Sequence, residues 1–349
     1  MSFKPIYKLR EFIDERKLDF RALSKNHNAI TLLLKNIDKI DCQEFSSNTH
    51  PIAVNMLSCA IHRIDWFNFS ANPGAVHVLL QYPDKINYHQ LHFNPNPKVL
   101  EIFEKYPNLI DWYWLCGNPD AIHFIRKNMD KIEYNSLSLN ENAMDILLEN
   151  LDKVNWRNLS ANSAALPILL NNPNKIDYNM FSINPGALPI LEKPENVNKI
   201  NWFQLICNPN IKNHLQFIEN NLYKFSNNSW YNKLNLWDKL SQIPEAIGII
   251  ERNLEHVDWD VLSSNPSAMH LLEQNQDKIN YTILSKNPAI FVLDKDAMRE
   301  QIKNFGKRKN NNADFGFAEE LIATVLHPRH FTRNLLQYGY DIVLNEYVE

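Results

Sequence analysis

The sequence predicts an all-α superhelical solenoid of about twelve short helix-pair repeats, each of 22–24 residues, with a cap at either end. An aromatic residue recurs at short intervals, followed three positions later by Leu or Phe and six positions later by Asn, usually as Asn-Pro. Each unit also contains start signals for two helices. The chain has only 7 Gly but many Asn, as expected where Asn begins and ends many short helices.

The recurring aromatic residues, here named stations, set the frame of the array. The twelve stations, with Cys in one slot, are Phe20, Cys42, Trp66, Tyr88, Trp112, Tyr134, Trp156, Tyr178, Trp202, Trp237, Trp259 and Tyr281. The step is 22 residues from Tyr134 to Trp156, 24 from Tyr88 to Trp112, and 35 from Trp202 to Trp237. Such self-similarity indicates stacked repeats that bury their apolar faces against their neighbours.

One unit, residues 258–279, shows how a repeat folds. Asp258 can cap a short helix that carries Trp259 and Leu262 on one face. Asn265 can cap a second helix with Pro266 at its first position, where the missing N–H costs nothing. The apolar stripe of this second helix is Ala268, Met269, Leu271 and Leu272. The unit is therefore expected to be a short helix and a longer helix joined by tight turns.

The abundant Asn residues are interpreted as structural. The expected caps of second helices include Asn72, Asn94, Asn118, Asn184 and Asn208. The expected terminators, which would end these helices in the left-handed conformation, include Asn128, Asn150, Asn253 and Asn275. Asn suits both roles, because its side chain hydrogen-bonds the nearby backbone and its backbone tolerates a positive φ.

Two other architectures have a period near 22. Continuous amphipathic helices of the lipid-binding kind need the same face after every repeat. At ~100° per residue, 22 residues advance the face by about 40° but 24 advance it by about 240°, so the mixed spacing scrambles the stripe. A leucine-rich repeat is the second alternative and stays open, although the units lack the Leu-x-Leu alternation that such a strand needs.

The domain organisation follows from where the repeat begins, lapses and ends. Residues 1–19 are expected to be an N-terminal cap, with a helix from Pro5 to Lys17, and residues 20–293 the array. Residues 294–349 are expected to be C-terminal capping helices, with segments at 294–304, 317–326 and 331–338. Caps are expected because an open end exposes the apolar face that inner repeats bury.

Two local irregularities stand out within the array. An insertion at about 226–235 is expected to form a surface loop, on which Trp230 and Tyr231 are either contact anchors or rings folded back over the junction. Pro167 and Pro189 fall inside expected second helices, where an interior proline costs ~3 kcal/mol. These two helices are therefore expected to start late or to kink.

Composition favours a soluble, non-secreted protein. The formal net charge of −4 and the pI near 6.3 give no bulk attraction to nucleic acid. No apolar run approaches the roughly 18 to 20 residues of a membrane span, and residues 1–15 lack the apolar core of a signal peptide. The widely spaced cysteines, expected to be reduced, are Cys42, Cys59, Cys116 and Cys207.

The sequence shows no constellation that carries chemistry. It has no Gly-rich phosphate loop. His77, His123 and His270 each follow a station by eleven residues, but they lie in repeats too far apart to share one metal. Cys59 and His62 have the spacing of two ligands without a second pair. No catalytic residue, metal site, cofactor or small-molecule substrate is therefore predicted.

A recognition surface is expected at variable positions within the fixed frame. On the second helix, the eleventh and fifteenth residues after the station share one face. The predicted partner-binding residues are His77, Gln81, His123, Lys127, Asp145, Glu149, Pro189, Lys193, His270 and Gln274, together with Trp230 and Tyr231. Their neighbours Leu79, Ile125, Leu147 and Leu272 are apolar. A varied solvent face without a partner would look the same.

Residues 262–281, which contain Asn-Pro-Ser-Ala-Met-His-Leu-Leu-Glu, and Asn-Leu-Asp-Lys-Val-Asn-Trp at 150–156 resemble the repeats of a known group. They are similar to the Asn-Pro-x-Ala-Ile-x-Leu-Leu-Glu repeats of uncharacterised proteins of giant nucleocytoplasmic DNA viruses, the mimivirus group especially. The ends, with Tyr-Lys-Leu-Arg-Glu-Phe-Ile-Asp at 7–14 and His-Pro-Arg-His-Phe at 327–331, resemble the ends of such proteins. The resemblance implies a virus-encoded protein that is found in the host cytoplasm of the infected cell or in the virion.

The expected function is that of a non-enzymatic scaffold or adaptor that binds another protein. The alternative from a different class is a structural component of a virus particle, a minor capsid or lining protein bound to other virion proteins. Nucleic-acid binding is less favoured. It would use the basic C-terminal residues Lys303, Lys307, Arg308, Lys309, Arg329, His330 and Arg333, which lack the interleaved aromatic residues typical of such surfaces.

Overall fold

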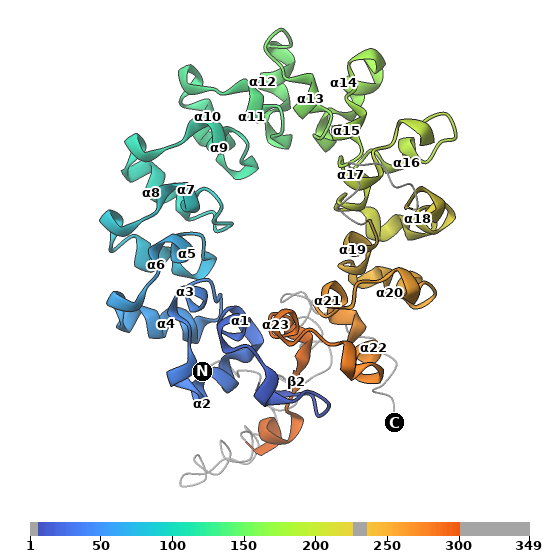
Figure 1. Cartoon of the computed structure of the whole chain (residues 1–349). Coiled ribbons are helices and arrows are strands. Elements are labelled where there is room, and N and C mark those ends of the chain that lie inside the picture. The colour runs from blue at the N-terminus through green and yellow to red at the C-terminus, as the bar shows by residue number, and fades with distance from the viewer. Residues whose placement is uncertain (1–5, 226–235, 301–349) are drawn as a thin grey trace, which may run out of the picture. The chain divides into compact units, whose positions relative to one another are not determined.

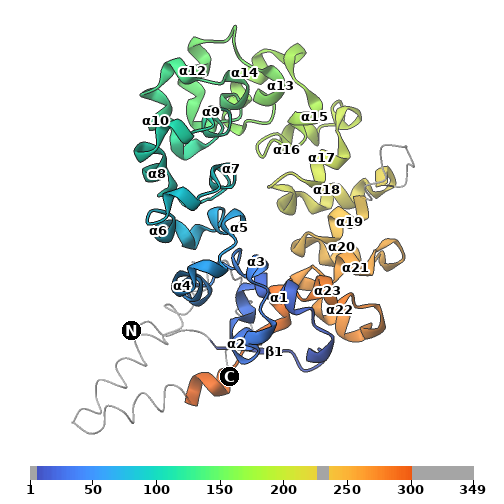
Figure 2. The same ribbon diagram turned by 60° about the vertical axis from the view of Figure 1, so that its left-hand side comes forward.

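The structure is a computed structural model that describes residues 6–225 and 236–300. The stations define twelve repeats, numbered here from Phe20 to Tyr281, and the described chain is an all-α repeat fold, as predicted. All twelve lie in one compact unit, Lys8–Val292. Figure 1 and Figure 2 show the first helices of successive repeats in one row and the second helices in another. No helix in the described ranges combines the length and hydropathy of a bilayer-spanning segment.

The first helix of each repeat is four to six residues long and begins at or beside the station. These helices are α1 (Phe20–Lys25), α3 (Cys42–Phe45), α5 (Trp66–Ser70), α7 (Tyr88–Leu91), α9 (Trp112–Cys116), α11 (Tyr134–Leu137), α13 (Trp156–Leu159), α15 (Tyr178–Phe181), α17 (Trp202–Ile206), α19 (Leu236–Ser241), α21 (Trp259–Leu262) and α23 (Tyr281–Leu284). In most of them the residue before the station accepts a backbone N–H, as Asp65 does from Asn68, which is N-capping. The Leu or Phe three positions after each station is almost fully buried.

The second helix packs behind the first and supplies the rest of the core. These helices are α2 (Ile30–Lys35), α4 (Pro51–Cys59), α6 (Val76–Leu79), α8 (Val99–Lys105), α10 (Ile122–Arg126), α12 (Met144–Glu149), α14 (Leu166–Asn171), α16 (Leu188–Leu191), α18 (Leu215–Asn220), α20 (Ile247–Glu251) and α22 (Met269–Gln274). Leu79, Ile125, Leu147 and Leu272, predicted to be apolar neighbours of the stripe, are 0–1% exposed. Burial of these side chains, about 1.5–3 kcal/mol each, is the main stabilising contribution.

Short 3-10 turns precede and follow most second helices. Those before are η2 (His27–Ala29), η5 (Pro73–Ala75), η8 (Pro119–Ala121), η10 (Glu141–Ala143), η11 (Ser163–Ala165), η14 (Ile211–His214), η16 (Pro244–Ala246) and η18 (Pro266–Ala268). In repeat 12 the equivalent turn η20 (Pro288–Ile290) precedes a strand. Those after are η3 (Ile37–Lys39), η4 (Ile61–Arg63), η6 (Pro83–Lys85), η7 (Pro107–Leu109), η9 (Met129–Lys131), η12 (Pro173–Lys175), η13 (Val197–Lys199), η15 (Leu222–Phe225), η17 (Leu254–His256) and η19 (Gln276–Lys278).

These turns explain how Pro167 and Pro189 are accommodated. The α-helical part of the second helix starts late, at Leu166 in α14 and at Leu188 in α16, so each proline lies in its first turn. Backbone N–H groups of the first turn have no intrahelical acceptor, so proline removes no hydrogen bond there. The predicted late start is confirmed.

The helix terminators do not use the left-handed conformation that the sequence suggested. Asn128, Asn150, Asn253 and Asn275 have φ between −131° and −140°. Their side-chain amides instead donate to the carbonyl four residues earlier, as Asn150 does to Ile146 at 2.9 Å. The expectation of a positive φ was wrong, because this side-chain bond satisfies a terminal carbonyl without a left-handed residue.

In most repeats the Asn six positions after the station joins neighbouring repeats as well as capping its own second helix. Asn184 accepts the N–H of Gly186 at 2.9 Å, and its amide donates to the carbonyls of Ser160 and Asn162 in the preceding repeat, both at 2.9 Å. Its side chain is 0% exposed. Because buried polar groups need partners, the Asn184 amide and the two backbone carbonyls that it bonds satisfy one another. The capping role was predicted; the link between repeats was not.

A second ladder joins the repeats through the residue four positions after the station. Ser182 donates to the Tyr178 carbonyl at 2.7 Å and accepts the N–H of Asn201 in the next repeat at 3.0 Å. A serine hydroxyl can make both bonds because it is a donor and an acceptor. The cysteine Cys116 takes this place in repeat 5, where its Sγ accepts the N–H of Glu133 at 3.4 Å. Burial raises the pKa of the Cys116 thiol, which favours the protonated form.

The twelfth repeat contacts the first through the same bonds. Asn26 donates to the carbonyls of Ser285 and Asn287 at 3.0 and 3.1 Å. The N–H of Asp19 donates to the Ser285 hydroxyl at 2.9 Å, and Lys17 lies over the Tyr281 ring at 5.3 Å, as Lys39 lies over Phe20 at 4.5 Å. Within Lys8–Val292 the array therefore closes on itself, whereas the sequence suggested two capped ends.

The predicted N-terminal capping helix over Pro5–Lys17 is wrong. The described part of this segment contains strand β1 (Tyr7–Leu9) and the 3-10 turn η1 (Glu15–Lys17). β1 pairs with β2 (Phe291–Leu293), and the Arg10 N–H donates to the Ile290 carbonyl at 2.9 Å. The spacing of the apolar residues Leu9, Phe12 and Ile13 suggested one face of a helix. The backbone of β1 is instead extended, because it pairs with β2, the strand that replaces the second helix of repeat 12. η1 then supplies that repeat's final turn.

After β2 the chain turns helical again. Asp294 accepts the N–H of Ala297 at 3.0 Å, and residues 295–300 are helical, as expected for the start of the polar helix predicted over 294–304. The two later helices, predicted at 317–326 and 331–338, lie outside the described residues. The basic C-terminal residues and the insertion with Trp230 and Tyr231 also lie outside them.

Candidate functional site

The ten predicted binding residues on the second helices are all exposed. The structure does not gather them into one site, because they are spread over α6, α10, α12, α16 and α22. Two of them contact a neighbouring repeat: Asp145 forms an ion pair with Arg126 at 2.7 Å, and His270 Nε2 lies within hydrogen-bond distance of Glu251 Oε1, at 2.6 Å. Such exposed pairs contribute about 0–1 kcal/mol each. For these two residues the structure shows contact with a neighbouring repeat, and partner binding by the stripe stays a prediction.

An exposed group of rings that was not predicted from the sequence lies on the other row of helices. His89 and Phe93 come from α7 and the residues that follow it, and Tyr113 and Trp114 come from α9 in the next repeat. We name these four residues the aromatic cluster. Phe93, Tyr113 and Trp114 are 49%, 46% and 40% exposed. Single exposed apolar side chains are ordinary, whereas a contiguous group of exposed rings is a candidate interaction site.

Trp114 is at the centre of the cluster. Its ring centroid lies 4.9 Å from that of Phe93 and 5.5 Å from that of Tyr113, in edge-to-face geometry. His89 lies 6.1 Å from Trp114 and 5.5 Å from Phe93. Edge-to-face pairs contribute about 0.5–1.5 kcal/mol beyond burial, so the rings hold one another in place while half of each remains in water.

His92 links the two helices that carry the cluster. It stands where most repeats have Ser: its Nδ1 lies 2.6 Å from the Tyr88 carbonyl, and its Nε2 lies 3.2 Å from the Asp111 N. Because a carbonyl only accepts, Nδ1 carries the proton and Nε2 accepts. Burial lowers the pKa of His92, which favours this neutral form. The ring also contacts Phe103, with centroids 4.8 Å apart.

Two further apolar residues extend the exposed surface on either side. Phe67 on α5 is 52% exposed, and Leu139, just after α11, is 39% exposed. Phe67, His89 and Tyr113 are the first residues after their stations, and Phe93 and Leu139 are the fifth. Helices α5, α7, α9 and α11 follow one another along the row of first helices (Figure 1). The surface therefore spans repeats 3 to 6.

A signal for this surface was present in the sequence. Residues one and five positions after the station share one face of the first helix, as the eleventh and fifteenth share one face of the second. In repeats 3 to 6 this face collects Phe67, His89, Phe93, Tyr113 and Leu139. In repeat 1 the same positions are Arg21 and Lys25. On the first helix, only the station and the residue three positions later were considered from the sequence, so these positions were not compared.

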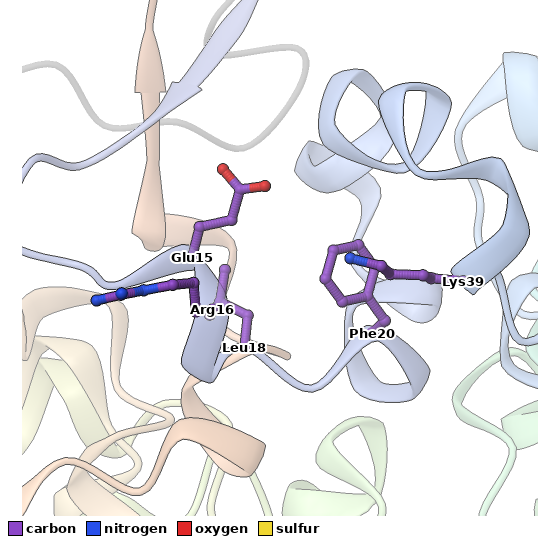
Figure 3. Close-up of a pocket in the computed structure, with 5 residues that line it drawn as sticks. All are labelled: Glu15, Arg16, Leu18, Phe20 and Lys39. Carbon is purple, nitrogen blue, oxygen red and sulfur yellow. The ribbon is translucent and has the colours of Figure 1, made fainter.

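A shallow hollow of about 330 Å³ lies near the beginning of the array (Figure 3). It is lined by Glu15, Arg16, Leu18, Phe20 and Lys39. Lys39 is stacked over Phe20, and Arg16 pairs with Asp14 at 2.9 Å. Both cations are therefore engaged with the protein itself, and we assign the hollow no function.

The described residues contain no group of three or more His, Cys, Asp and Glu side chains that could hold a metal ion. Cys59 and His62 are both exposed, and all four cysteines are free. His77 and His123 lie on α6 and α10, in repeats 3 and 5. Comparison of the chain with protein-family models, with curated proteins and with solved structures gave no match.

Proposed function

We propose that this protein is a non-enzymatic scaffold that binds another protein through the aromatic cluster and the surface around it. The observation that carries the proposal is the exposure of Phe93, Tyr113 and Trp114 side by side. Aromatic residues, Trp and Tyr above all, are enriched at the centres of protein interfaces.

The size of the surface supports a hot spot within a larger interface. Covering the exposed parts of the three rings removes roughly 250 Å² from water, which contributes about 6 kcal/mol at 25 cal/mol per Å². Association alone costs an estimated 4–15 kcal/mol, and a standard interface covers about 800 Å² on each partner. The rings therefore need further contacts, which Phe67 and Leu139 in the flanking repeats offer.

The frame suits a binding surface because it is fixed by buried bonds. Asn94, next to Phe93, joins repeat 4 to repeat 3 by donating to the carbonyls of Ser70 and Asn72, both at 2.9 Å, and His92 joins α7 to the start of α9. A rigid surface loses little conformational freedom on binding, which improves affinity.

The proposal is tested by affinity capture from extracts of the natural source with three forms of the full chain. These are the unchanged chain, a variant with Phe93→Ser, Tyr113→Ser and Trp114→Ser, and a control with His77→Ala, His123→Ala and Lys127→Ala on the second helices. We expect the unchanged chain and the control to retain one set of proteins that the Ser variant loses. Retention of that set by the Ser variant, with loss by the control, would instead support the stripe predicted from the sequence.

The resemblance to repeat proteins of giant viruses suggests where the partner is found. Quantitative mass spectrometry of purified particles beside the soluble fraction of infected cells separates two sources. A fixed ratio to the shell protein in particles would favour a structural virion component, whereas presence only in the soluble fraction would favour an adaptor.

A further inference from the structure

We infer that the partner presents Lys or Arg side chains to the aromatic cluster, so that the surface recognises a cationic peptide segment. The inference rests on the proposed function and adds the chemistry of the occupant. It is carried by a comparison of the same two positions in different repeats.

The first residue after a station contacts the residue before the next station. Asn155 donates to the Asn135 side chain at 2.9 Å, and Asn201 donates to that of Asn179 at 2.9 Å. In repeat 7 the pair is charged: Arg157 lies 3.9 Å from Asp177. In repeat 1, Arg21 lies 4.0 Å from Asp41. An arginine at this position thus balances the carboxylate that caps the next first helix.

Repeats 4 and 5 have the carboxylate without the arginine. The equivalent pairs are His89 with Asp111 and Tyr113 with Glu133, and all four side chains are exposed. Among the described residues, no Lys or Arg forms an ion pair with Asp111 or Glu133. The position that holds a guanidinium in repeats 1 and 7 here holds a ring of the aromatic cluster.

The segments around the aromatic cluster also carry only negative charges. Segments 65–72, 87–94, 111–118 and 133–140, which carry the first helices of repeats 3 to 6, contain Asp65, Asp111 and Glu133 and no Lys or Arg. A cation placed over Tyr113 or Trp114 would meet the negative face of a ring and a nearby carboxylate together. A phosphate would meet only repulsion, so single-stranded nucleic acid, which needs a positive groove beside its stacking rings, does not fit.

The protein already uses this chemistry internally. Lys175 lies over the Trp156 ring at 4.4 Å from its centroid, and Lys278 lies over Trp259 at 4.3 Å. Each lysine lies in the final turn of a repeat and reaches back to the station of the same repeat. The aromatic cluster presents rings of the same kind to solvent, with no cation of the described chain over them.

The test is selection of a random 12-residue peptide library, displayed on phage, against the immobilised full chain at low salt. We expect the selected peptides to be enriched in Arg and Lys. Binding of a selected peptide, made synthetically, should weaken at least tenfold with Trp114→Ala. It should weaken two- to fivefold with Glu133→Gln, and also when NaCl is raised to 0.5 M, because salt screens exposed charges. The matched control Glu149→Gln, an exposed carboxylate on α12, should leave the affinity unchanged.

The outcomes separate the inference from the proposed function. Peptides that depend on Trp114 but carry no excess of cations, and that bind Glu133→Gln as well, would overturn the inference and leave the protein-binding role standing. Peptides whose affinity is the same for Trp114→Ala would overturn both. Glu133→Gln is expected to fold normally, since its side chain is exposed and caps no helix. Tyr113→Ala provides a second ring variant if Trp114→Ala unfolds.

Discussion

The junction between repeats 12 and 1 and the junction between repeats 9 and 10 differ in their hydrogen bonds. Repeat 12 is not followed in the chain by repeat 1, yet this closing junction keeps both ladders. Asn26 donates to the carbonyls of Ser285 and Asn287, and the Asp19 N–H donates to the Ser285 hydroxyl. At repeats 9 and 10 the chain runs on through the insertion, and the ladders lapse. Ile206 stands in the Ser position, and Ile243 stands in the Asn position.

Other contacts hold the junction of repeats 9 and 10. Arg252 reaches back to Glu219 at 2.6 Å, and Lys212 lies 3.6 Å from Glu245. Helix α19 of repeat 10 packs on α17 of repeat 9, and its residues Leu236, Trp237 and Leu240 are 0–7% exposed. Between repeats 9 and 10, which are joined by the chain itself, apolar packing and ion pairs thus replace the polar ladders. Between repeats 12 and 1, where only non-covalent contacts hold the repeats together, both ladders are complete.

The largest expected effect is at the Asn ladder. Asn26→Ala removes the two bonds across the closing junction and the bond to the Asn28 N–H, and it leaves buried carbonyls without this donor. At about 1 kcal/mol for each bond and more for groups left unsatisfied, we expect the free energy of unfolding in urea to fall by about 2–4 kcal/mol. Asn184→Ala, inside the array, should cost the same. A cost for Asn184→Ala alone would mean that the closing junction does not form in solution.

The Ser ladder allows a matched pair of variants. The Ser285 hydroxyl donates to Tyr281 and accepts from Asp19, whereas the buried Ser241 hydroxyl has no hydrogen-bond partner among the described residues. Ser285→Ala should lower the free energy of unfolding by about 1–2 kcal/mol, and Ser241→Ala should leave it unchanged or raise it slightly. Equal costs in chemical denaturation would show that Ser241 is bonded in solution.

The lapse at repeat 10 can be repaired. Ile243 has φ −87° and ψ 112°, close to the −79° and 119° of Asn265, so Asn fits without strain. Ile243→Asn would supply a cap for α20 and donors for the carbonyls of repeat 9. We expect a gain of about 1 kcal/mol in the free energy of unfolding. Ile243→Ala, which removes packing without adding a cap, should be destabilising. A loss with Asn would show that the apolar packing of Ile243 outweighs the ladder here.

The smallest effect is a pH dependence at His92. Burial lowers its pKa in the folded state, so it contributes stability that is fully present above the unfolded value of about 6.5 and is lost as the pH falls through the lower folded value. We expect stability to fall between pH 7.5 and pH 5, and less so in His92→Ser. The Ser variant also loses the contact with Phe103, which lowers its stability at every pH. The quantity to compare is therefore the change in the free energy of unfolding with pH, not its absolute value. Parallel curves for the two proteins would contradict the prediction.

Local signals within one repeat were predictable from the sequence. The stations, the caps, the apolar stripe and the late start before Pro167 and Pro189 depend on a few consecutive residues, whose backbone hydrogen bonds are mostly satisfied within the unit. The prediction of an N-terminal helix was wrong because the structure of that segment depends on distant residues. Its apolar residues fit a helix, but its backbone pairs with residues 291–293, about 280 positions away.

The candidate site also combines features that are set within one repeat and features that are set by contacts between repeats. The sequence determined the repeat, its register and its capped helices, because these follow from periodicity and capping within about 22 residues. The tertiary structure alone decided that the twelfth repeat contacts the first. It also decided that the rings of α7 and α9 meet on an exposed surface, and that the residue after a station contacts the carboxylate before the next one. Those outcomes depend on which faces successive repeats bury against one another, and no single repeat contains that information.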